Sequence, residues 1–597
     1  MLFSTYLVHK QWTNQPVNNV STCKAFYSKR NQNLLIRCFE AYNLLMNNKL
    51  RILLAQVNPT VGALNKNTDL LLSAYQEAKK DDIDIVAFPE MFLTGYQVQD
   101  LILKPSFLKD VSRYLKIISN ECSGETSVLF GAPILDKGKL YNAYLQVKKG
   151  ELTIITKKKH LPNLGIFDEN RYFHSGKIAK VFKIKGLRIG CPICEDIWHS
   201  DVTNTLQRKG ADLLLSPNGS PYERNKISLR QDIVRQRCLE TNLPIIYLNL
   251  VGGQDDQVFD GGSFMMSKDG EVKMQLPQFE EKKSLLELGN QDSFIGNSQN
   301  LVTEIDTDIA QDYRAITEGT KDYVLKSGFT KVVLGLSGGI DSALVATIAV
   351  DALGANNVTC IRLPSQFSSK GSLDDADALV KKLGCKIKTI PISEIFDITL
   401  QSLSPEFKNR PQDLSEENIQ SRIRGVLLMA LSNKFGSMLL TTGNKSEVAV
   451  GYSTIYGDMC GGYNPIKDLY KTRLYDICKW RNSQKQPWMK GPGGEVIIKK
   501  ILEKPPSAEL RPGQKDEDSL PPYHLLDLIL ESLIENNMSV REVAKLGVDL
   551  EMIRKIEKLV YASEHKRFQS APGVHLTQGS FWLSRRYPLI QQWTDPS

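Results

Sequence analysis

The sequence lacks the long apolar segments that a membrane protein requires. No run comes near the roughly 18 consecutive apolar residues of a membrane-spanning helix, so we expect a soluble protein with no membrane partner. Cysteine is scarce, at 10 of 597 residues, which argues against a disulfide scaffold and favours a reducing compartment, the cytoplasm. Neither charge dominates, because 75 Lys and Arg face 67 Asp and Glu. The net charge of +8 is too diffuse to predict a nucleic-acid partner.

What is present is the composition of an ordinary globular protein, with 41% hydrophobic and 24% charged residues. At about 150 residues per domain, length alone predicts roughly four domains. The order of the local patterns reduces this number to two large α/β domains, at residues 50–285 and 306–597. A polar stretch at 286–305 is the predicted linker.

Residues 1–45 differ in composition from the rest of the chain. They contain five Lys or Arg and a single acid, Glu40, together with many Ser, Asn and Thr. This composition partly resembles a transit peptide. It is equally compatible with a disordered tail, or with translation that starts at Met46. We therefore exclude this extension from the prediction of the fold.

Short apolar runs that end at Pro, Gly or Asn alternate with amphipathic stretches in both domains. In the first domain we expect a helix at 67–80 and strands at 51–57, 83–88, 127–130, 143–148, 187–191, 212–216 and 244–249. In the second we expect helices at 313–327 and 342–353, and strands at 331–336 and 358–363. Such alternation with short turns predicts layered α/β domains.

Three residues that follow predicted strands could form a cysteine-nucleophile site. They are Glu90 in Phe88-Pro-Glu90, Lys158 in Lys158-Lys-His-Leu161-Pro162, and Cys194 in Cys194-Glu-Asp-Ile-Trp198. A carboxylate can take the proton of a thiol, and a nearby lysine can stabilise a tetrahedral oxyanion. Each of these residues, considered alone, is better explained as an ordinary surface or core residue.

Cys191 and Cys194 also form a Cys-x-x-Cys pair, which raises a redox or zinc alternative. A zinc site would need a second pair of ligands at suitable spacing, and none is evident. We therefore expect Cys191 to be a core residue of its strand.

The three segments, in this order, resemble the nitrilase family in its glutamine-amidase form. The resemblance implies that Glu90 is the general base, that Cys194 forms the γ-glutamyl thioester and that Lys158 stabilises the oxyanion. It also implies that Ser220 and Lys226, in the segment Ser216–Lys226, hold glutamine. Leu164 takes the position of a glutamine-binding residue that is usually aromatic in the family.

The second domain has a glycine-rich loop between a strand and a helix, Gly335-Leu336-Ser337-Gly338-Gly339-Ile340-Asp341-Ser342. Backbone N–H groups in such a turn, together with a helix N-terminus, bind phosphate. The loop lacks the Gly-Lys-Ser/Thr ending of a Walker A motif. It resembles the loop of the N-type ATP pyrophosphatases, and Asp341 suits a magnesium ligand.

Later segments narrow the resemblance further. They include Glu417–Arg424, Thr441–Glu447, Gly451–Met459, Asn464–Thr472 and Lys504–Pro512. This set is similar to the NAD synthetases, and with the preceding amidase it resembles the glutamine-dependent NAD synthetases over nearly all residues after Met46.

What the resemblance implies is an N-terminal αββα sandwich and a C-terminal doubly wound, Rossmann-like parallel sheet. The loop 335–342 and Thr442 would then hold ATP, while Asn418, Glu447 and Lys566 would contact deamido-NAD. Asp341 and Glu447 would hold Mg²⁺. The implied reaction is the ATP-dependent amidation of deamido-NAD with glutamine, carried out by a homo-oligomer, octamers being among the forms of the family.

Two alternatives remain open at this point. One keeps the architecture but changes the acceptor, as in GMP synthetase or another amide ligase. The other is an α/β scaffold that has lost activity. The segments Lys504-Pro-Pro-Ser-Ala-Glu-Leu510 and Gly451-Tyr-Ser-Thr454 weigh against the first, and the complete triad and loop weigh against the second.

Overall fold

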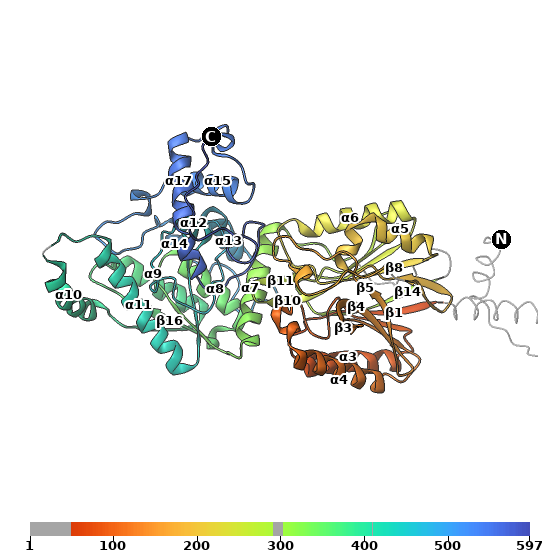
Figure 1. The fold of residues 1–597 in the computed structure, drawn as a ribbon. Coiled ribbons are helices and arrows are strands. Elements are labelled where there is room, and N and C mark those ends of the chain that lie inside the picture. The colour runs from red at the N-terminus through yellow and green to blue at the C-terminus, as the bar shows by residue number, and fades with distance from the viewer. Residues whose placement is uncertain (1–48, 179, 290–301, 409) are drawn as a thin grey trace, which may run out of the picture.

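The protein is described by a computed structural model that covers residues 49–178, 180–289, 302–408 and 410–597. The extension at 1–45 and most of the predicted linker lie outside these residues. Two α/β bodies follow one another along the chain and meet at helix α7 (Asp308–Lys326) (Figure 1).

The first body consists of two six-stranded sheets packed face to face. The first sheet has the order β14-β1-β2-β3-β4-β5 and the second β13-β12-β9-β8-β7-β6. The strands of the first sheet are β1 (Leu50–Gln56), β2 (Ile85–Ala87), β3 (Ser127–Asp136), β4 (Lys139–Lys148), β5 (Glu151–Lys157) and β14 (Lys282–Leu288). Those of the second are β6 (Phe182–Ile184), β7 (Leu187–Gly190), β8 (Leu213–Asn218), β9 (Ile245–Asn249), β12 (Phe264–Met266) and β13 (Val272–Gln275).

Helices cover the outer faces of both sheets. In Figure 1, α3 (Leu64–Lys80) and α4 (Pro105–Glu121) lie on one side of the sandwich, and α5 (Ser200–Arg208) and α6 (Lys226–Thr241) on the other. Leu53 and Ala55 of β1 pack in the core that includes α3, whereas Leu50, Ile52 and Leu54 pack between the two sheets. Both faces of β1 are thus buried, which explains why the four residues Ile52–Ala55 are all apolar rather than alternating with polar ones. The predicted αββα sandwich is confirmed.

The second body is built on four parallel strands in the order β17-β16-β15-β18. They are β15 (Val332–Gly335), β16 (Val358–Arg362), β17 (Lys386–Thr389) and β18 (Met438–Leu440). The helices around and after this sheet are α8 (Ile340–Leu353), α9 (Lys370–Leu383), α10 (Ser393–Phe407), α11 (Leu414–Phe435), α12 (Lys445–Val450), α13 (Lys471–Ser483) and α14 (Lys499–Glu503).

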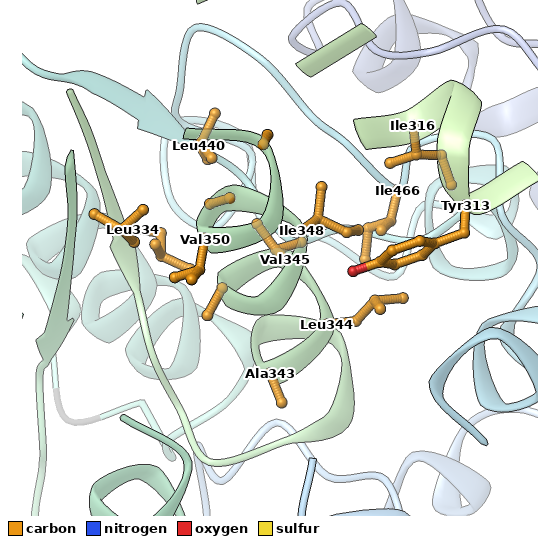
Figure 2. Close-up of a cluster of buried hydrophobic side chains, with 14 of the residues drawn as sticks. Tyr313, Ile316, Leu334, Ala343, Leu344, Val345, Ile348, Val350, Leu440 and Ile466 are labelled. Atoms are coloured by element: carbon orange, nitrogen blue, oxygen red, sulfur yellow. The ribbon is translucent and has the colours of Figure 1, made fainter. Parts of the chain in front are cut away.

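Helix α8 is the centre of this body. All of its residues except Asp341 are buried, and its side chains pack against Leu334 of β15 and against Tyr313 and Ile316 of α7 (Figure 2). A helix that is apolar on every side is stable only when it is enclosed. The central position of α8 fixes the loop at its N-terminus relative to the sheet. The predicted doubly wound parallel sheet is confirmed.

A third, smaller core lies beyond the sheet, near the C-terminus. It unites α12 with α15 (Tyr523–Ile534), α16 (Val540–Ala544) and α17 (Leu550–Ala562), and α18 (Glu564–Phe568) follows. Among the described residues, no helix combines the length and the apolar character needed to cross a bilayer.

Strand β14 extends three residues beyond residue 285, the predicted end of the first domain. Strand β14 continues to Leu288 and pairs antiparallel with β1 along its whole length. Leu286 and Leu288 are buried between the sheets, so these residues belong to the domain and not to the linker. A strand added from the far end of a domain is hard to distinguish from a linker by composition, since it contains charged residues such as Glu287, which pairs with Arg51.

The two bodies are joined through α7 and the hairpin of β10 (Val251–Gln254) and β11 (Gln257–Asp260). At Gly319 of α7 a Cβ atom would lie 2.8 Å from Val258 Cγ2, so only glycine permits this close approach. Asp312, also on α7, is fully buried and accepts hydrogen bonds from Tyr222 and Arg224 of the first body and from Arg473 of the second. Side chains from both bodies therefore converge on one helix.

Candidate active sites

The structure brings Glu90, Lys158 and Cys194 together in the interior of the first body, just beyond the ends of three strands. They follow β2, β5 and β7 respectively. Lys158 Nζ lies 2.8 Å from Glu90 Oε1, and neither side chain is exposed. Cys194 is also buried, and it lies near enough for both charges to influence the pKa of its thiol. The three predicted residues thus form one cluster.

A second glutamate, Glu169, completes this cluster and was missed in the sequence. Its Oε2 lies 2.8 Å from Lys158 Nζ, the same atom that Glu90 contacts. Asn142 donates to both carboxylates, at 2.8 Å to Glu90 and 3.2 Å to Glu169. In the sequence Glu169 lies in Asp168-Glu-Asn-Arg171, which is typical of an exposed turn. Only its position after the Leu161-Pro162 segment could have drawn attention to it.

Burial and charge set the protonation of the cluster. Burial lowers the pKa of Lys158, but Glu169 and Glu90 raise it more, so that the pKa is well above its usual value and the ammonium keeps its proton. Burial raises the pKa of the Cys194 thiol well above its usual value, and Glu90 raises it further. The thiol is therefore neutral at rest, and a base must remove its proton during attack.

Cys194 also has an unusual backbone. Its φ is 44°, in the left-handed region, and it starts the short 3₁₀ helix η3 (Cys194–Trp198). Few non-glycine residues occupy this region, and such conformations concentrate at functional sites. The turn follows β7 and places Cys194 close enough to Glu90 and Lys158 for their charges to act on its thiol.

The predicted glutamine-binding residues have different surroundings. Ser220 is buried and its hydroxyl accepts a hydrogen bond from Arg230, which is itself paired with Asp260. Lys226 is the first residue of α6. Leu164 lies at the surface with 85% of its area exposed, so the structure does not bring it into the buried cluster. All three assignments stay predictions.

The second site is a cleft of about 300 Å³ at the carboxyl end of β15 and β16. Its lining includes all of the loop residues predicted to hold ATP except Gly338, and it includes Thr442. Gly338 has a φ of +81°, and a Cβ atom there would lie 2.2 Å from the carbonyl oxygen of Ser372. This glycine therefore lets the loop pass directly beneath α9, while the N-terminus of α8 opens into the cleft.

Asp341 and Glu447 lie on either side of Lys471, a residue for which no role was predicted. Lys471 Nζ is 2.6 Å from Asp341 Oδ2 and 3.1 Å from Glu447 Oε1. Burial raises the pKa of Glu447 to about 7, against the opposing effect of Lys471, and the nearby Asp341 raises it further. Burial lowers the pKa of Lys471, but the two carboxylates raise it above its usual value.

The carboxylates of Asp341 and Glu447 could hold Mg²⁺ only if a bound substrate supplied further oxygen ligands. Within the described part of the chain, no three Asp, Glu, His or Cys side chains are grouped as a metal would require. Asp341 and Glu447 nevertheless both line the cleft and offer the carboxylate oxygens that Mg²⁺ prefers. Mg²⁺ is commonly held by one or two carboxylates together with phosphate oxygens and water.

Asn418 and Lys566 are not among the residues that line the cleft. Asn418 accepts a hydrogen bond from the Thr454 hydroxyl, and Lys566 donates to the carbonyl oxygens of Gly451 and Ser453. Both side chains therefore hold the loop between α12 and α13. Their contact with deamido-NAD stays a prediction.

Comparison with known proteins agrees with this division of the chain. Residues 51–291 match the family model described as carbon-nitrogen hydrolase, and residues 312–570 match that described as NAD synthase. The chain is 51% identical over 552 residues to the glutamine-dependent NAD(+) synthetase of Rhodobacter capsulatus, covering 92% of this chain and 100% of the relative. It is 40% identical over 581 residues to that of Thermotoga maritima, with the same coverage.

A solved structure is similar over the same extent. The glutamine-dependent NAD⁺ synthetase from Acinetobacter baumannii, in complex with ADP, superimposes with a TM-score of 0.72 at 36% identity, covering 92% of this chain and 100% of that one. Relatives at this identity and coverage share the whole order of the two bodies. The chain therefore belongs to the glutamine-dependent NAD(+) synthetases, in which a carbon-nitrogen hydrolase domain precedes an NAD synthase domain.

Proposed function

We propose that the chain converts deamido-NAD to NAD with glutamine as the nitrogen donor and ATP as the activating substrate, the final step of NAD biosynthesis. The observation that carries this proposal is the presence, in one chain, of a buried Glu90–Lys158–Cys194 cluster and a nucleotide-sized cleft around loop 335–342. An amidase site releases ammonia and a phosphate-binding site activates a carboxylate, so the two sites supply the two halves of an amidation.

In the first site Cys194 attacks the amide carbon of glutamine while Glu90 accepts the thiol proton. The Lys158 ammonium stabilises the negative charge that develops on the carbonyl oxygen. Glu90 returns the thiol proton to the departing nitrogen, ammonia leaves, and water then hydrolyses the γ-glutamyl thioester to glutamate. Because the pKa of Cys194 is raised by burial, attack is coupled to proton transfer and does not start from a standing thiolate.

In the second site the nicotinate carboxylate of deamido-NAD attacks the α-phosphorus of ATP and diphosphate leaves. Ammonia then attacks the adenylate, giving NAD and AMP. The N–H groups of the loop and the N-terminus of α8 hold the phosphates. Most free ammonium is protonated at neutral pH, so a dry route between the sites would keep the nucleophile unprotonated.

Asp341 and Glu447 are the residues that would hold Mg²⁺, which neutralises phosphate charge when bound. Lys471 donates hydrogen bonds to both carboxylates. We further propose that the chain acts as a homo-oligomer, with the octamer as the form suggested by the family, and that it works in the cytoplasm.

The test is an NAD-forming assay with deamido-NAD, ATP and Mg²⁺, supplied with either glutamine or ammonium. Cys194→Ala is expected to abolish NAD formation from glutamine while leaving NAD formation from ammonium at the wild-type rate. Loss of both activities in a protein that keeps its fold would refute the assignment of two separate sites.

A further inference from the structure

Asp196, two residues after the nucleophile, is buried and makes no contact in the structure with a group that reacts. Only 2% of its surface is exposed. Its carboxylate accepts hydrogen bonds from backbone N–H groups alone, and these come from two separate segments of the chain. A buried carboxylate that is fully engaged with backbone N–H groups fixes the relative position of those backbones.

One carboxylate oxygen secures the turn that carries Cys194. Asp196 Oδ2 accepts the N–H of Ile193 at 3.1 Å, and the N–H of Asp196 donates in return to the Ile193 carbonyl at 2.9 Å. These two bonds close a ring around Cys194, whose φ of 44° is unfavourable for a non-glycine residue. The ring therefore offsets the cost of that conformation and limits the directions in which the sulfur can point.

The segment that carries Lys158 is held mainly by the other carboxylate oxygen. Asp196 Oδ1 accepts the N–H of Lys159 at 3.1 Å and that of His160 at 2.8 Å, and the N–H of Lys159 also lies 3.4 Å from Oδ2. Lys158 immediately precedes these two residues, at the end of β5. The strands β5 and β7 belong to different sheets, so the sheet hydrogen bonds do not fix Lys158 relative to Cys194.

We propose that Asp196 is a positioning residue of the amidase site, which sets the separation of Cys194 and Lys158 by binding both backbones at once. The proposal rests on the proposed function of Cys194 and Lys158. In the amidase reaction the sulfur and the ammonium must act on the same carbonyl group, one at its carbon and the other at its oxygen. A displacement of about 1 Å between such groups can cost about 100-fold in rate.

Asp196→Asn is the most informative variant because it preserves the shape of the side chain. Its single oxygen can serve either Ile193 or the pair Lys159 and His160, while its NH₂ group must face the remaining N–H donors. The two segments are then no longer held by one group. The matched control is Asp201→Asn, which removes the same charge from a half-exposed aspartate that binds the side chains of Lys159 and His160.

The experiment measures glutamine hydrolysis, ammonium-dependent NAD formation and the rate at which iodoacetamide alkylates Cys194, each in the full-length protein. For Asp196→Asn we expect kcat for glutamine hydrolysis to fall about 100-fold. The KM for glutamine should change by less than about threefold, since the binding groups stay. Alkylation should slow, and ammonium-dependent synthesis should remain at the wild-type level. Asp201→Asn should leave all of these quantities within about twofold of wild type.

A wild-type kcat in Asp196→Asn would overturn the proposal. An equal loss of the ammonium-dependent activity in Asp196→Asn would also overturn it, because Asp196 would then support the fold of the whole chain rather than the positions of Cys194 and Lys158. Cys194→Ala, measured in parallel, separates the two levels of inference: if it still used glutamine, the proposed amidase site itself would be wrong, whatever the result for Asp196.

Discussion

Replacing Lys158 with methionine should make the stability of the amidase domain fall more steeply with rising pH than that of the wild type. The Lys158 ammonium lies 2.8 Å from a carboxylate oxygen of both Glu90 and Glu169, and none of the three side chains is more than 5% exposed. Methionine keeps an unbranched side chain, one atom shorter than that of lysine, and removes the charge. Two buried carboxylates are then left without their cation.

The magnitude follows from the cost of leaving a buried charge unpaired. Removal of one partner of a buried ion pair typically costs about 3–5 kcal/mol. Protonation can relieve that cost. Burial already raises the pKa of Glu169, with Lys158 opposing the rise, so the loss of Lys158 removes the main influence that lowers it. In the variant, the folded state should bind a proton that the unfolded state releases above about pH 4.5.

The sign of the pH dependence is therefore defined. A carboxyl group whose pKa is raised by folding contributes stability at low pH and loses that contribution as pH rises from its unfolded pKa to its folded one. The difference in stability between wild type and Lys158→Met should be small near about pH 5 and should grow by up to about 1.4 kcal/mol per pH unit. The pKa of Lys158 itself is raised, so the wild-type ion pair is lost only at strongly alkaline pH.

The assay is differential scanning calorimetry of the full chain at several pH values between about 5 and about 8, the range in which carboxyl groups with raised pKa values titrate. Lys159→Met is the matched control, since Lys159 is the next residue, is partly exposed and pairs with Asp201 instead. The melting temperature of Lys158→Met should fall with rising pH relative to both wild type and control. An equal destabilisation at all pH values would refute the reasoning, as would wild-type glutamine hydrolysis by the variant.

Three further predictions concern the second body and its junction with the first. Asp341→Asn should fail to form NAD from either nitrogen source while glutamine hydrolysis partly survives, and wild-type NAD formation would remove this residue from the site. Gly338→Ala places a Cβ atom 2.2 Å from a backbone oxygen and should raise the KM for ATP at least about tenfold, equivalent to about 1.4 kcal/mol. Gly328→Ala, with a similar φ of +85° but open space around it, should leave that KM unchanged, and equal effects would exclude the close contact as the cause. Asp312→Ala leaves two guanidinium groups without their buried carboxylate and should cost about 3–5 kcal/mol. In calorimetry we expect it to separate the melting of the two bodies, and an unchanged single transition would contradict a joining role for Asp312.

The sequence by itself determined the elements and the chemistry that they carry. The apolar run at 51–57 is a buried strand because both of its faces contact apolar layers, and such a run is visible in the order of residues. The loop 335–342 was recognisable for a similar reason, since its glycines, its acid and the following helix are contiguous. Local patterns therefore identified both domains, the family resemblance and the residues of the predicted triad.

Only the tertiary structure decided which side chains from distant segments meet. Glu169 joins Glu90 around one ammonium although 79 residues separate them, and Lys471 lies between Asp341 and Glu447. Nothing in the local sequence of these residues distinguishes them from surface charges, because a charge becomes costly or useful only once burial and partners are fixed. The same holds for Asp196, Asp312 and the late strand β14. Local patterns determine where strands and loops occur, whereas the packing of sheets and helices decides what each polar side chain finally contacts.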